Sequence, residues 1–246
     1  LESVLSVEHV LQRHGVDVVF DPTTLSMLPA AKGAEYQRQK CAEGQLGGVA
    51  DLVVVVGGDG SLLGYGRAMA ASGVPVLGIN RGGLGFLAAI SPDQIDSRFD
   101  DILTGDYIIE EHFLLETSIL RQGQKVATQT ALNDIVISPG GASRMMEFAL
   151  WLDDDYVYDQ RSDGLIVASP TGSTAYALSA GGPIMHPALD AIVIVPMFPH
   201  TLTSRPLVVP GDGVLKVVPV QMGNGEAQVS CDSQVQMPFA LGDEIQ

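Results

Sequence analysis

The 246-residue sequence predicts an α/β domain with a parallel sheet, followed by an all-β domain. In the first hundred residues, apolar runs alternate with helix-patterned segments at the spacing of a doubly wound sheet. From about residue 106, short strand-like runs alternate with turn residues, a pattern typical of all-β domains. We therefore divide the chain into a Rossmann-like α/β domain (1–105), an all-β domain (106–234) and a C-terminal segment (235–246) that can return to the first domain.

In the first domain, apolar residues at helical spacing alternate with buried strands. The pattern predicts helices at Val4–His14, Ala34–Cys41, Ser61–Ala71 and Pro92–Leu103, and strands at Val16–Phe20, Leu52–Val56 and Val74–Asn80. Gly15 is expected to end the first helix. The continuous apolar run Leu52–Val56 is typical of a strand that is buried on both faces of a parallel sheet.

In the second domain, the expected elements are mostly strands. They are Phe113–Leu120, Lys125–Leu132, Ile135–Ser138, Glu147–Leu152, Leu165–Ala168, Ile192–Val195, Leu207–Val209, Val214–Val220 and Ala227–Cys231. One short helix is expected at Thr174–Ala180, closed by Gly181.

Composition excludes several classes of protein. Apolar residues make up 46% of the chain and charged residues 17%, so the chain is globular and not disordered. Thirteen basic and 29 acidic residues give a net charge of −16, which argues against nucleic acid as a partner. No apolar run approaches the ~20 residues of a membrane span. The two cysteines, Cys41 and Cys231, fit no metal spacing and are expected to be reduced thiols of a cytoplasmic protein.

A glycine-rich turn, Gly57-Gly58-Asp59-Gly60, directly follows the strand Leu52–Val56. Backbone N–H groups of such a turn, and the helix start behind it, favour a phosphate. A carboxylate there suits a divalent metal that bridges phosphates, or acceptance of a proton from an attacking hydroxyl. A plain helix cap is the structural alternative. The P-loop pattern is absent because no lysine lies in a glycine-rich motif.

Three other motifs lie at strand ends. Asn80-Arg81 precedes the loose dinucleotide pattern Gly83-x-Gly85-x-x-Ala88, and Arg81 can supply positive charge beside the Asp59 turn. Asn133-Asp134 suits a ribose or an amide-bearing ring, but is also common in turns. The block 161–183 contains a turn of small hydroxyl residues, Pro170–Ser173, which either leaves room for a flat ring or packs tightly on the sheet. The five histidines show no zinc spacing, and no side chains are assigned to a metal.

Taken together, these motifs resemble those of the bacterial NAD kinases. The resemblance rests on Gly57–Gly60, on Asn133-Asp134 and on the long block Asp163–Tyr176, and it extends to Phe198–Pro206 and Ser230–Gln234. The family transfers a phosphoryl group from ATP, or in some members polyphosphate, to the 2′-hydroxyl of the adenosine ribose of NAD. The resemblance implies an α/β domain with a β-sandwich, Mg²⁺ or Mn²⁺ as cofactor, and a homodimer or homotetramer.

The resemblance also implies roles for individual residues. Asp59 is the expected proton acceptor, with Gly60 beside it on the nucleotide, while Gly57, Gly58 and Arg81 are candidates for the phosphate donor. The expected NAD-binding residues are Asp59, Gly60, Asn133, Asp134, Arg144, Arg161, Asp163, Thr174, Ala175, Tyr176, Ala177, Leu178, Ser179 and Gln234.

This chain departs from the family pattern in a few places. It has Asn133-Asp134 where members often have Asn-Glu, and the family's first strand with its glycine turn and a C-terminal segment are expected to be missing. Two rival functions share the motifs. A lipid or sugar kinase uses the same glycine turn, but a lipid kinase should show an apolar or basic membrane face. A non-catalytic NAD(P) sensor gains nothing from a carboxylate that faces phosphate.

Overall fold

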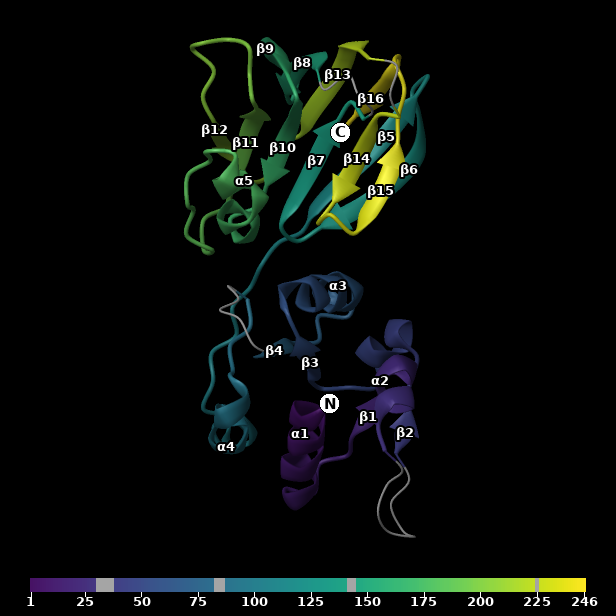
Figure 1. The fold of residues 1–246 in the computed structure, drawn as a ribbon, viewed down its shortest axis with the longest axis vertical. Helices are drawn as coiled ribbons and strands as arrows, with labels where there is room; N and C mark the ends of the chain where they lie inside the picture. Colours follow the sequence, from purple (N-terminus) through teal and green to yellow (C-terminus); the bar gives the residue numbers. More distant parts are fainter. Residues whose placement is uncertain (30–37, 82–86, 141–144, 224–225) are drawn as a thin grey trace. The chain divides into compact units, whose positions relative to one another are not determined.

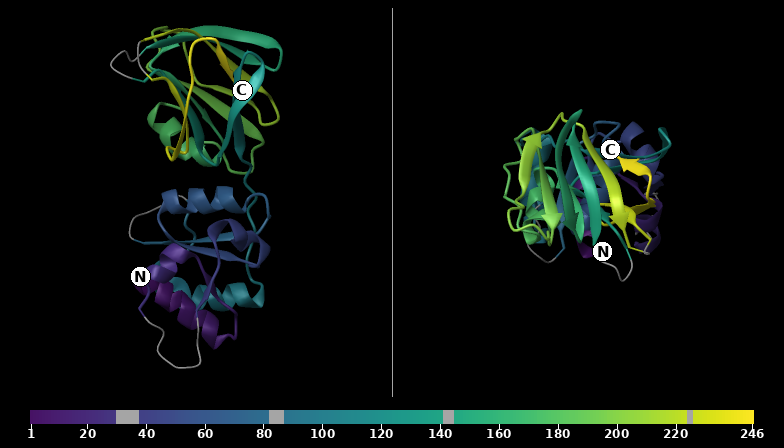
Figure 2. Two further views of the ribbon diagram at one scale, coloured as in Figure 1. Left: turned by 90° about the vertical axis from the view of Figure 1, so that its right-hand side faces the viewer. Right: turned by 90° about the horizontal axis from the view of Figure 1, so that it is seen from above.

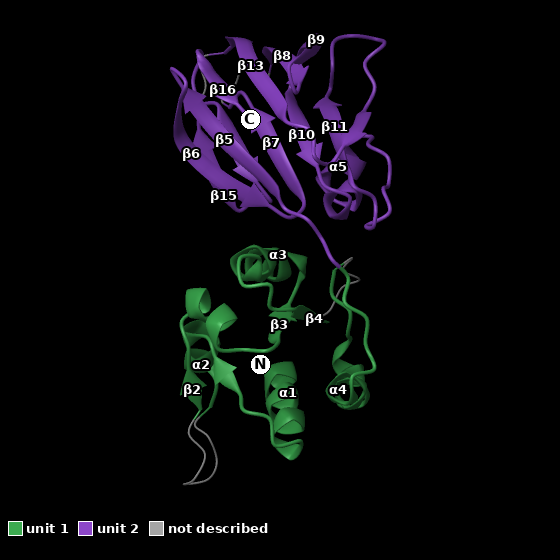
Figure 3. Ribbon diagram, turned by 180° about the vertical axis from the view of Figure 1, so that it is seen from behind, with its two compact units in different colours: residues 1–110 green, residues 111–246 purple. Residues whose placement is uncertain are grey.

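The computed structural model describes residues 1–29, 38–81, 87–140, 145–223 and 226–246. The chain forms two compact units, residues 1–110 and 111–246 (Figure 3). The predicted fold class is confirmed, because the first unit is a small α/β region with parallel strands and the second consists of antiparallel sheets (Figure 1).

The first unit is built on two pairs of parallel strands. Its elements are α1 (Glu2–Arg13), β1 (Val19–Phe20), α2 (Pro22–Met27), β2 (Gln39–Lys40), the 3₁₀ helix η1 (Glu43–Gly48), β3 (Val53–Gly57), α3 (Asp59–Met69), β4 (Val76–Asn80), the 3₁₀ helix η2 (Pro92–Gln94) and α4 (Ile95–Thr104). β1 pairs with β2, and β3 pairs with β4. Gly15, at φ +69, follows α1 as expected, and the Val16 N–H donates back to the Leu11 carbonyl.

The strand β3 is buried on both faces, as its apolar run predicts. Val54 and Val56 pack against the cluster formed by α1 and α4, whereas Val53 and Val55 pack with Leu46 and Met69 on the other side. Figure 2 shows α3 on one side of this sheet and α1 with α4 on the other. Because both faces are covered, only the ends of the strands are left for a ligand.

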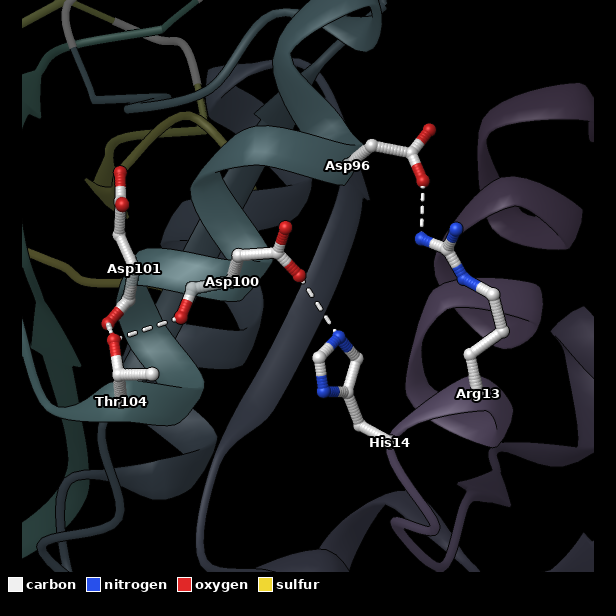
Figure 4. A network of polar contacts seen from close by, with 6 residues as sticks. All are labelled: Arg13, His14, Asp96, Asp100, Asp101 and Thr104. Carbon is white, nitrogen blue, oxygen red and sulfur yellow. Dashed lines mark hydrogen bonds and ion pairs between the residues drawn. The ribbon is translucent and has the colours of Figure 1, made fainter.

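Helices α1 and α4 are also tied together by polar contacts (Figure 4). Arg13 pairs with Asp96 at 2.5 Å, and the His14 ring nitrogen Nε2 lies 2.8 Å from an Asp100 carboxylate oxygen. All four side chains are exposed, so each pair adds little to stability. The apolar contacts of Val10, Leu11 and Phe99 hold the helices together.

Residues 21–50 fold differently from the expectation. The helix around Ala34–Cys41 is wrong where it can be compared: residues 34–37 lie outside the described residues, and 39–40 form β2 beside β1. Pairing with Val19–Phe20 overrides the weak helical pattern. The helix α2 was not expected, although Asp21 caps it through the N–H groups of Thr23 and Thr24, with Pro22 following as its first residue.

The second unit contains two six-stranded antiparallel sheets. Its strands are β5 (Leu115–Arg121), β6 (Gln124–Ala131), β7 (Asp134–Ser138), β8 (Met146–Leu152), β9 (Asp155–Ser162), β10 (Gly164–Ala168), β11 (Ala191–Met197), β12 (Leu207–Pro210), β13 (Leu215–Met222), β14 (Gln228–Cys231), β15 (Val235–Pro238) and β16 (Asp243–Ile245). The orders are β12-β11-β10-β7-β14-β15 and β6-β5-β16-β13-β8-β9. Between β10 and β11 lie the 3₁₀ helix η3 (Thr171–Thr174) and α5 (Tyr176–Ser179).

The two sheets share one apolar core. Phe148 and Leu150 of one sheet and Ile137, Leu165 and Ile194 of the other are each at most 1% exposed and belong to the same cluster. Nearly all strands were expected, but β9, β15 and β16 were not. The segment 235–246, for which the sequence left open a return to the first domain, forms β15 and β16 within the second unit.

Candidate nucleotide-binding site

The glycine turn lies at the carboxyl ends of two neighbouring parallel strands. Gly57 ends β3 and is paired with Asn80, which ends β4. Arg81 follows Asn80 and is exposed, so a cation lies one strand away from the Gly57–Gly60 turn. The carboxyl end of a parallel sheet, at the start of a helix, is where α/β proteins bind phosphates.

Asp59 is the first residue of α3. The N-cap residue of α3 is Gly58, which makes no side-chain cap hydrogen bond. Asp59 therefore does not occupy the N-cap position that a plain capping role requires. The Leu87 N–H donates to Asp59 Oδ1 at 3.4 Å, and the side chain is half-buried. A Cβ on Gly57 would lie 2.8 Å from Ser61 Oγ, so a larger residue there would have to displace the Ser61 side chain. Gly83 and Gly85 of the loose dinucleotide pattern lie outside the described residues.

In the second unit, three turns meet at one end of a sheet. Asp134 begins β7 and is paired with Ala168, which ends β10; on the other side Ile135 is paired with Cys231, which ends β14. The turns that start at 132, 169 and 231 are therefore neighbours, although up to 100 residues of sequence separate them. This end of the sheet collects most of the second-unit residues that we predicted to bind NAD.

The turns at 132 and 169 are in close contact. The Ser169 hydroxyl donates to the Leu132 carbonyl at 2.5 Å, and the Ser169 N–H donates to the Asn133 carbonyl at 2.9 Å. A Cβ on Gly172 would lie 2.0 Å from the Asn133 carbonyl oxygen, so only glycine fits there. Ser169, Gly172 and the fully buried Ser173 are thus packing residues of the site.

Asn133 has a buried acceptor without a donor. Its side-chain oxygen Oδ1 is shielded from solvent and has no hydrogen-bond partner among the described residues. A buried polar atom without a partner is costly, and native proteins retain few of them. The atom is therefore a candidate contact for an N–H or O–H group of a ligand.

Asp134 is 3% exposed, and its surroundings disfavour the negatively charged form of the carboxyl group. Burial, and then the nearby carboxylate of Asp232, raise the pKa of Asp134 to about 6, while a backbone hydrogen bond from Tyr176 opposes the rise. A carboxylate held in such an environment is a common feature of binding sites.

The substitution Asp134→Asn is expected to stabilise the protein at neutral pH. Because the pKa is higher in the folded state, the folded chain binds the proton more tightly. This tighter proton binding stabilises the folded wild-type protein below the ordinary pKa of an aspartate, and the stabilisation is lost as the pH rises through about 6. Thermal unfolding at pH 4.5 and 7.5 should show that the free energy of unfolding of Asp134→Asn, relative to the wild type, is about 2 kcal/mol higher at pH 7.5 than at pH 4.5. Asp154→Asn, at an exposed turn, is the control; an equal gain at both pH values would contradict the argument.

The block after β10 is a tight turn with a short helix. The expected helix at Thr174–Ala180 is shorter, with 3₁₀ geometry up to Thr174 and only four α-helical residues, because the hydroxyls of Ser173 and Thr174 bond to backbone carbonyls. Thr174 and Ala175 are half-buried, and Tyr176, Leu178 and Ser179 are exposed. Ala177, by contrast, is fully buried in a cluster with Ile166 and Val193, so its side chain packs on the sheet.

Two of the predicted residues lie at the other end of β10. Asp163 precedes that strand, and its N–H bonds to the Met197 carbonyl; Arg161 is exposed on β9, where its carbonyl accepts from the His200 N–H. The five residues of β10 place Asp163 about 17 Å from the Asn133 turn. Gln234 is exposed on the 231 turn, near Asp134, whereas Arg144 lies outside the described residues.

Sequence reasoning missed Asp232. Its carboxylate accepts hydrogen bonds from the N–H groups of Leu132, Asn133 and Asp134, at 3.0, 2.7 and 3.2 Å. The one signal was its position in the block Ser230–Gln234, which carries the resemblance.

The described residues contain no group of three or more side chains that could hold a metal by themselves. Among the same residues, no helix combines the length and apolar character needed to cross a membrane.

Comparison with known proteins decides the family. The family model of the ATP-NAD kinase N-terminal domain matches residues 1–107. The family model of the ATP-NAD kinase C-terminal domain matches residues 132–246. The chain belongs to the NAD kinase family. The resemblance based on Gly57–Gly60, Asn133-Asp134 and the block Asp163–Tyr176 is thereby confirmed.

Individual NAD kinases are similar over the whole chain. The NAD kinase of Ectopseudomonas mendocina is 51% identical over 245 residues, which cover all of this chain and 81% of that protein. That of Azotobacter vinelandii is 53% identical over 236 residues, covering 96% and 78%. Among solved structures, yeast NADH kinase complexed with NADH has a TM-score of 0.87 at 26% identity, covering 99% of this chain and 74% of that one. An NAD kinase from Archaeoglobus fulgidus in complex with ATP has a TM-score of 0.70 at 25% identity, covering 99% and 85%.

Proposed function

We propose that this chain transfers the terminal phosphoryl group of ATP to the 2′-hydroxyl of the adenosine ribose of NAD, giving NADP. The observation that carries the proposal is the Asn133-Asp134 turn: a buried amide oxygen without a donor beside a buried carboxylate, in a member of the NAD kinase family. Asn133 Oδ1 accepts from an N–H or O–H group of NAD, and Asp134 accepts from another.

The remaining NAD contacts follow the family pattern. They come from Asp59, Gly60, Arg144, Thr174, Ala175, Tyr176, Leu178, Ser179 and Gln234. Ala177 contributes through its backbone, because its side chain is buried on the sheet. The small side chains of this block leave space for a flat ring, and the exposed Tyr176 offers a face on which a ring can stack.

Arg161 and Asp163 are proposed to act on NAD from a second copy of the chain. They lie at the opposite end of β10 from the Asn133 turn, about 17 Å away. A homodimer or homotetramer, as in the family, brings the two ends from different copies to one nucleotide.

Asp59 is proposed to accept the proton of the 2′-hydroxyl as the new P–O bond forms and the bond to the leaving phosphate breaks. Phosphoryl transfer depends mainly on positioning and on neutralising charge. Gly57 and Gly58 offer backbone N–H groups at the start of α3, and Arg81 offers a cation one strand away.

A divalent ion, Mg²⁺ or Mn²⁺, is proposed to enter with the nucleotide. Mg²⁺ in kinases is held by one or two carboxylates together with substrate phosphates, and Asp59 is a carboxylate at the start of α3 that can take part in holding it. When bound, the ion neutralises charge on the phosphates. Polyphosphate is the alternative donor, and the cytoplasm, where NAD and ATP are available, is the proposed compartment.

The function is tested by a coupled assay. Purified protein is incubated with NAD, ATP and Mg²⁺, and NADP is detected with an NADP-specific dehydrogenase. Formation of NADP supports the proposal. If a folded protein binds NAD but forms no NADP with ATP or with polyphosphate, the chain is a sensor and the proposal is wrong. A second set of tubes with a lipid or sugar acceptor tests the other rival.

Asn133→Ala is expected to raise KM for NAD about tenfold, the loss of one hydrogen bond of roughly 1.4 kcal/mol, with a smaller change in kcat. Gln129→Ala removes an exposed amide side chain from β6 and serves as the control. Steady-state kinetics with NAD varied at saturating ATP measure both constants. An unchanged KM for NAD would remove Asn133 from the NAD contacts.

A further inference from the structure

The turn at residues 132–134 has a complete set of backbone hydrogen bonds, supplied by two residues. The Asp232 carboxylate accepts hydrogen bonds from the N–H groups of all three residues. The Asp232 N–H donates to the Asp134 carbonyl at 2.9 Å. Ser169 donates to the other two carbonyls, with its hydroxyl to that of Leu132 and with its N–H to that of Asn133. All six backbone polar groups of the three residues are therefore accounted for.

Asp232 is itself held in an unusual backbone conformation. Its φ is +50, in the left-handed region that is uncommon outside glycine and that Asn, Asp and His adopt more often than other residues, and Ser233 follows at φ +56. The residue is 6% exposed, so its carboxylate is solvated by the three N–H groups in place of water. The β14–β15 turn therefore presents one carboxylate to the neighbouring turn in a fixed position.

The side chains of the held turn are left for other contacts. The backbone of Asn133 is bonded on both sides, while its Oδ1 is buried without a partner. Holding a binding group rigidly by its backbone lowers the entropy that is lost when the ligand binds. A shift of the turn by 1 Å would misplace both Asn133 and Asp134 at once.

We infer that Asp232 is a positioning residue for NAD: it holds the Asn133-Asp134 turn in the geometry that binds the nucleotide, without contacting the nucleotide itself. This inference rests on the proposed function of that turn. Asp232 also keeps a second carboxylate beside Asp134, so the position is occupied at a cost in electrostatic energy. Replacing Asp232 by Asn removes this repulsion together with the acceptor for the Leu132 N–H, and it keeps an acceptor for the N–H groups of Asn133 and Asp134.

The test compares Asp232→Ala with Asp232→Asn. Alanine removes every side-chain acceptor, whereas the asparagine oxygen can still accept from Asn133 and Asp134, which both bond to the same oxygen of Asp232. We expect alanine to raise KM for NAD and the calorimetric Kd for NAD at least about tenfold, with KM for ATP and kcat changed less than threefold. Asparagine should recover most of the loss.

The matched control is Asp153→Ala. Asp153 is also left-handed, at φ +54, and its Oδ1 also accepts a backbone hydrogen bond, from the Val214 N–H at 2.9 Å, but it lies in the β8–β9 turn. It should leave KM for NAD unchanged. Wild-type KM and Kd in Asp232→Ala would overturn the inference, as would equal losses in KM for both substrates and in kcat.

Two outcomes separate this inference from the proposed function. A wild-type protein that forms no NADP contradicts the function, while the calorimetric Kd for NAD still tests Asp232. If alanine does not fold, asparagine decides: a two- to fivefold rise in Kd for NAD supports positioning, and an unchanged Kd overturns it.

Discussion

Asp59→Asn is expected to lower kcat at least about 100-fold while NAD still binds, because general-base catalysis contributes about 10²–10⁴-fold. The amide keeps the shape of the side chain and an oxygen that can accept from the Leu87 N–H, but it cannot take a proton from the 2′-hydroxyl. The coupled assay measures kcat, and calorimetry measures NAD binding.

The control for this prediction is Asp51→Asn, in the same unit at an exposed position before β3. It should leave kcat near the wild-type value. Near-normal turnover in Asp59→Asn would remove Asp59 from the role of proton acceptor, whereas loss of NAD binding would assign it to the binding of substrate instead.

Gly172→Ala is expected to lower both the stability of the second unit and its affinity for NAD. The new Cβ would lie 2.0 Å from the Asn133 carbonyl oxygen and 2.3 Å from its carbon, and neither backbone atom can move without shifting the turn. Overpacking of this kind costs about 1–3 kcal/mol or more. The shift also misplaces Asn133, so Kd for NAD should rise about 100-fold.

Thermal unfolding and calorimetry measure these two effects. Gly44→Ala is the control, because a Cβ there meets nothing within 4 Å and the backbone is unstrained. A Gly172→Ala protein with wild-type stability and wild-type affinity for NAD would show that the turns at 132 and 169 are not in the close contact described above.

Local pattern was enough to predict the strand β3, the glycine turn after it and the helix α3, but not the fold of residues 21–50. The run Leu52–Val56 and the turn Gly57–Gly60 identify a strand end and a helix start from neighbouring residues alone. The pairing of Gly57 with Asn80 then follows from the parallel order of two consecutive strands. Where pattern was weak, as in β9, the reason is physical: half of this edge strand is exposed and its two buried residues, Gln160 and Ser162, are polar, so the segment shows no apolar alternation.

The proposed binding turn of the second unit was only half predictable. Asn133 and Asp134 stand out as a motif, but Asp232 meets them across 98 to 100 positions of sequence, and no local pattern reports such a contact. Conversely, Asp163 and Thr171 belong to one continuous motif, yet the buried strand β10 separates them in space. Proximity in sequence therefore overstated what a single copy brings together.

The dependence of the Asn133 turn on Asp232 also sets the order in which parts of the second unit can fold during synthesis. Residues 132–134 leave the ribosome well before residue 232 is made, and β14 pairs with β7 across the same interval. Closing so long a loop is entropically unfavourable and slow compared with local pairing. The hairpin of β5 and β6 can form early, but the Asn133 turn is held only once β14 has docked. With the role proposed for this turn, affinity for NAD is among the last properties that a newly made chain acquires.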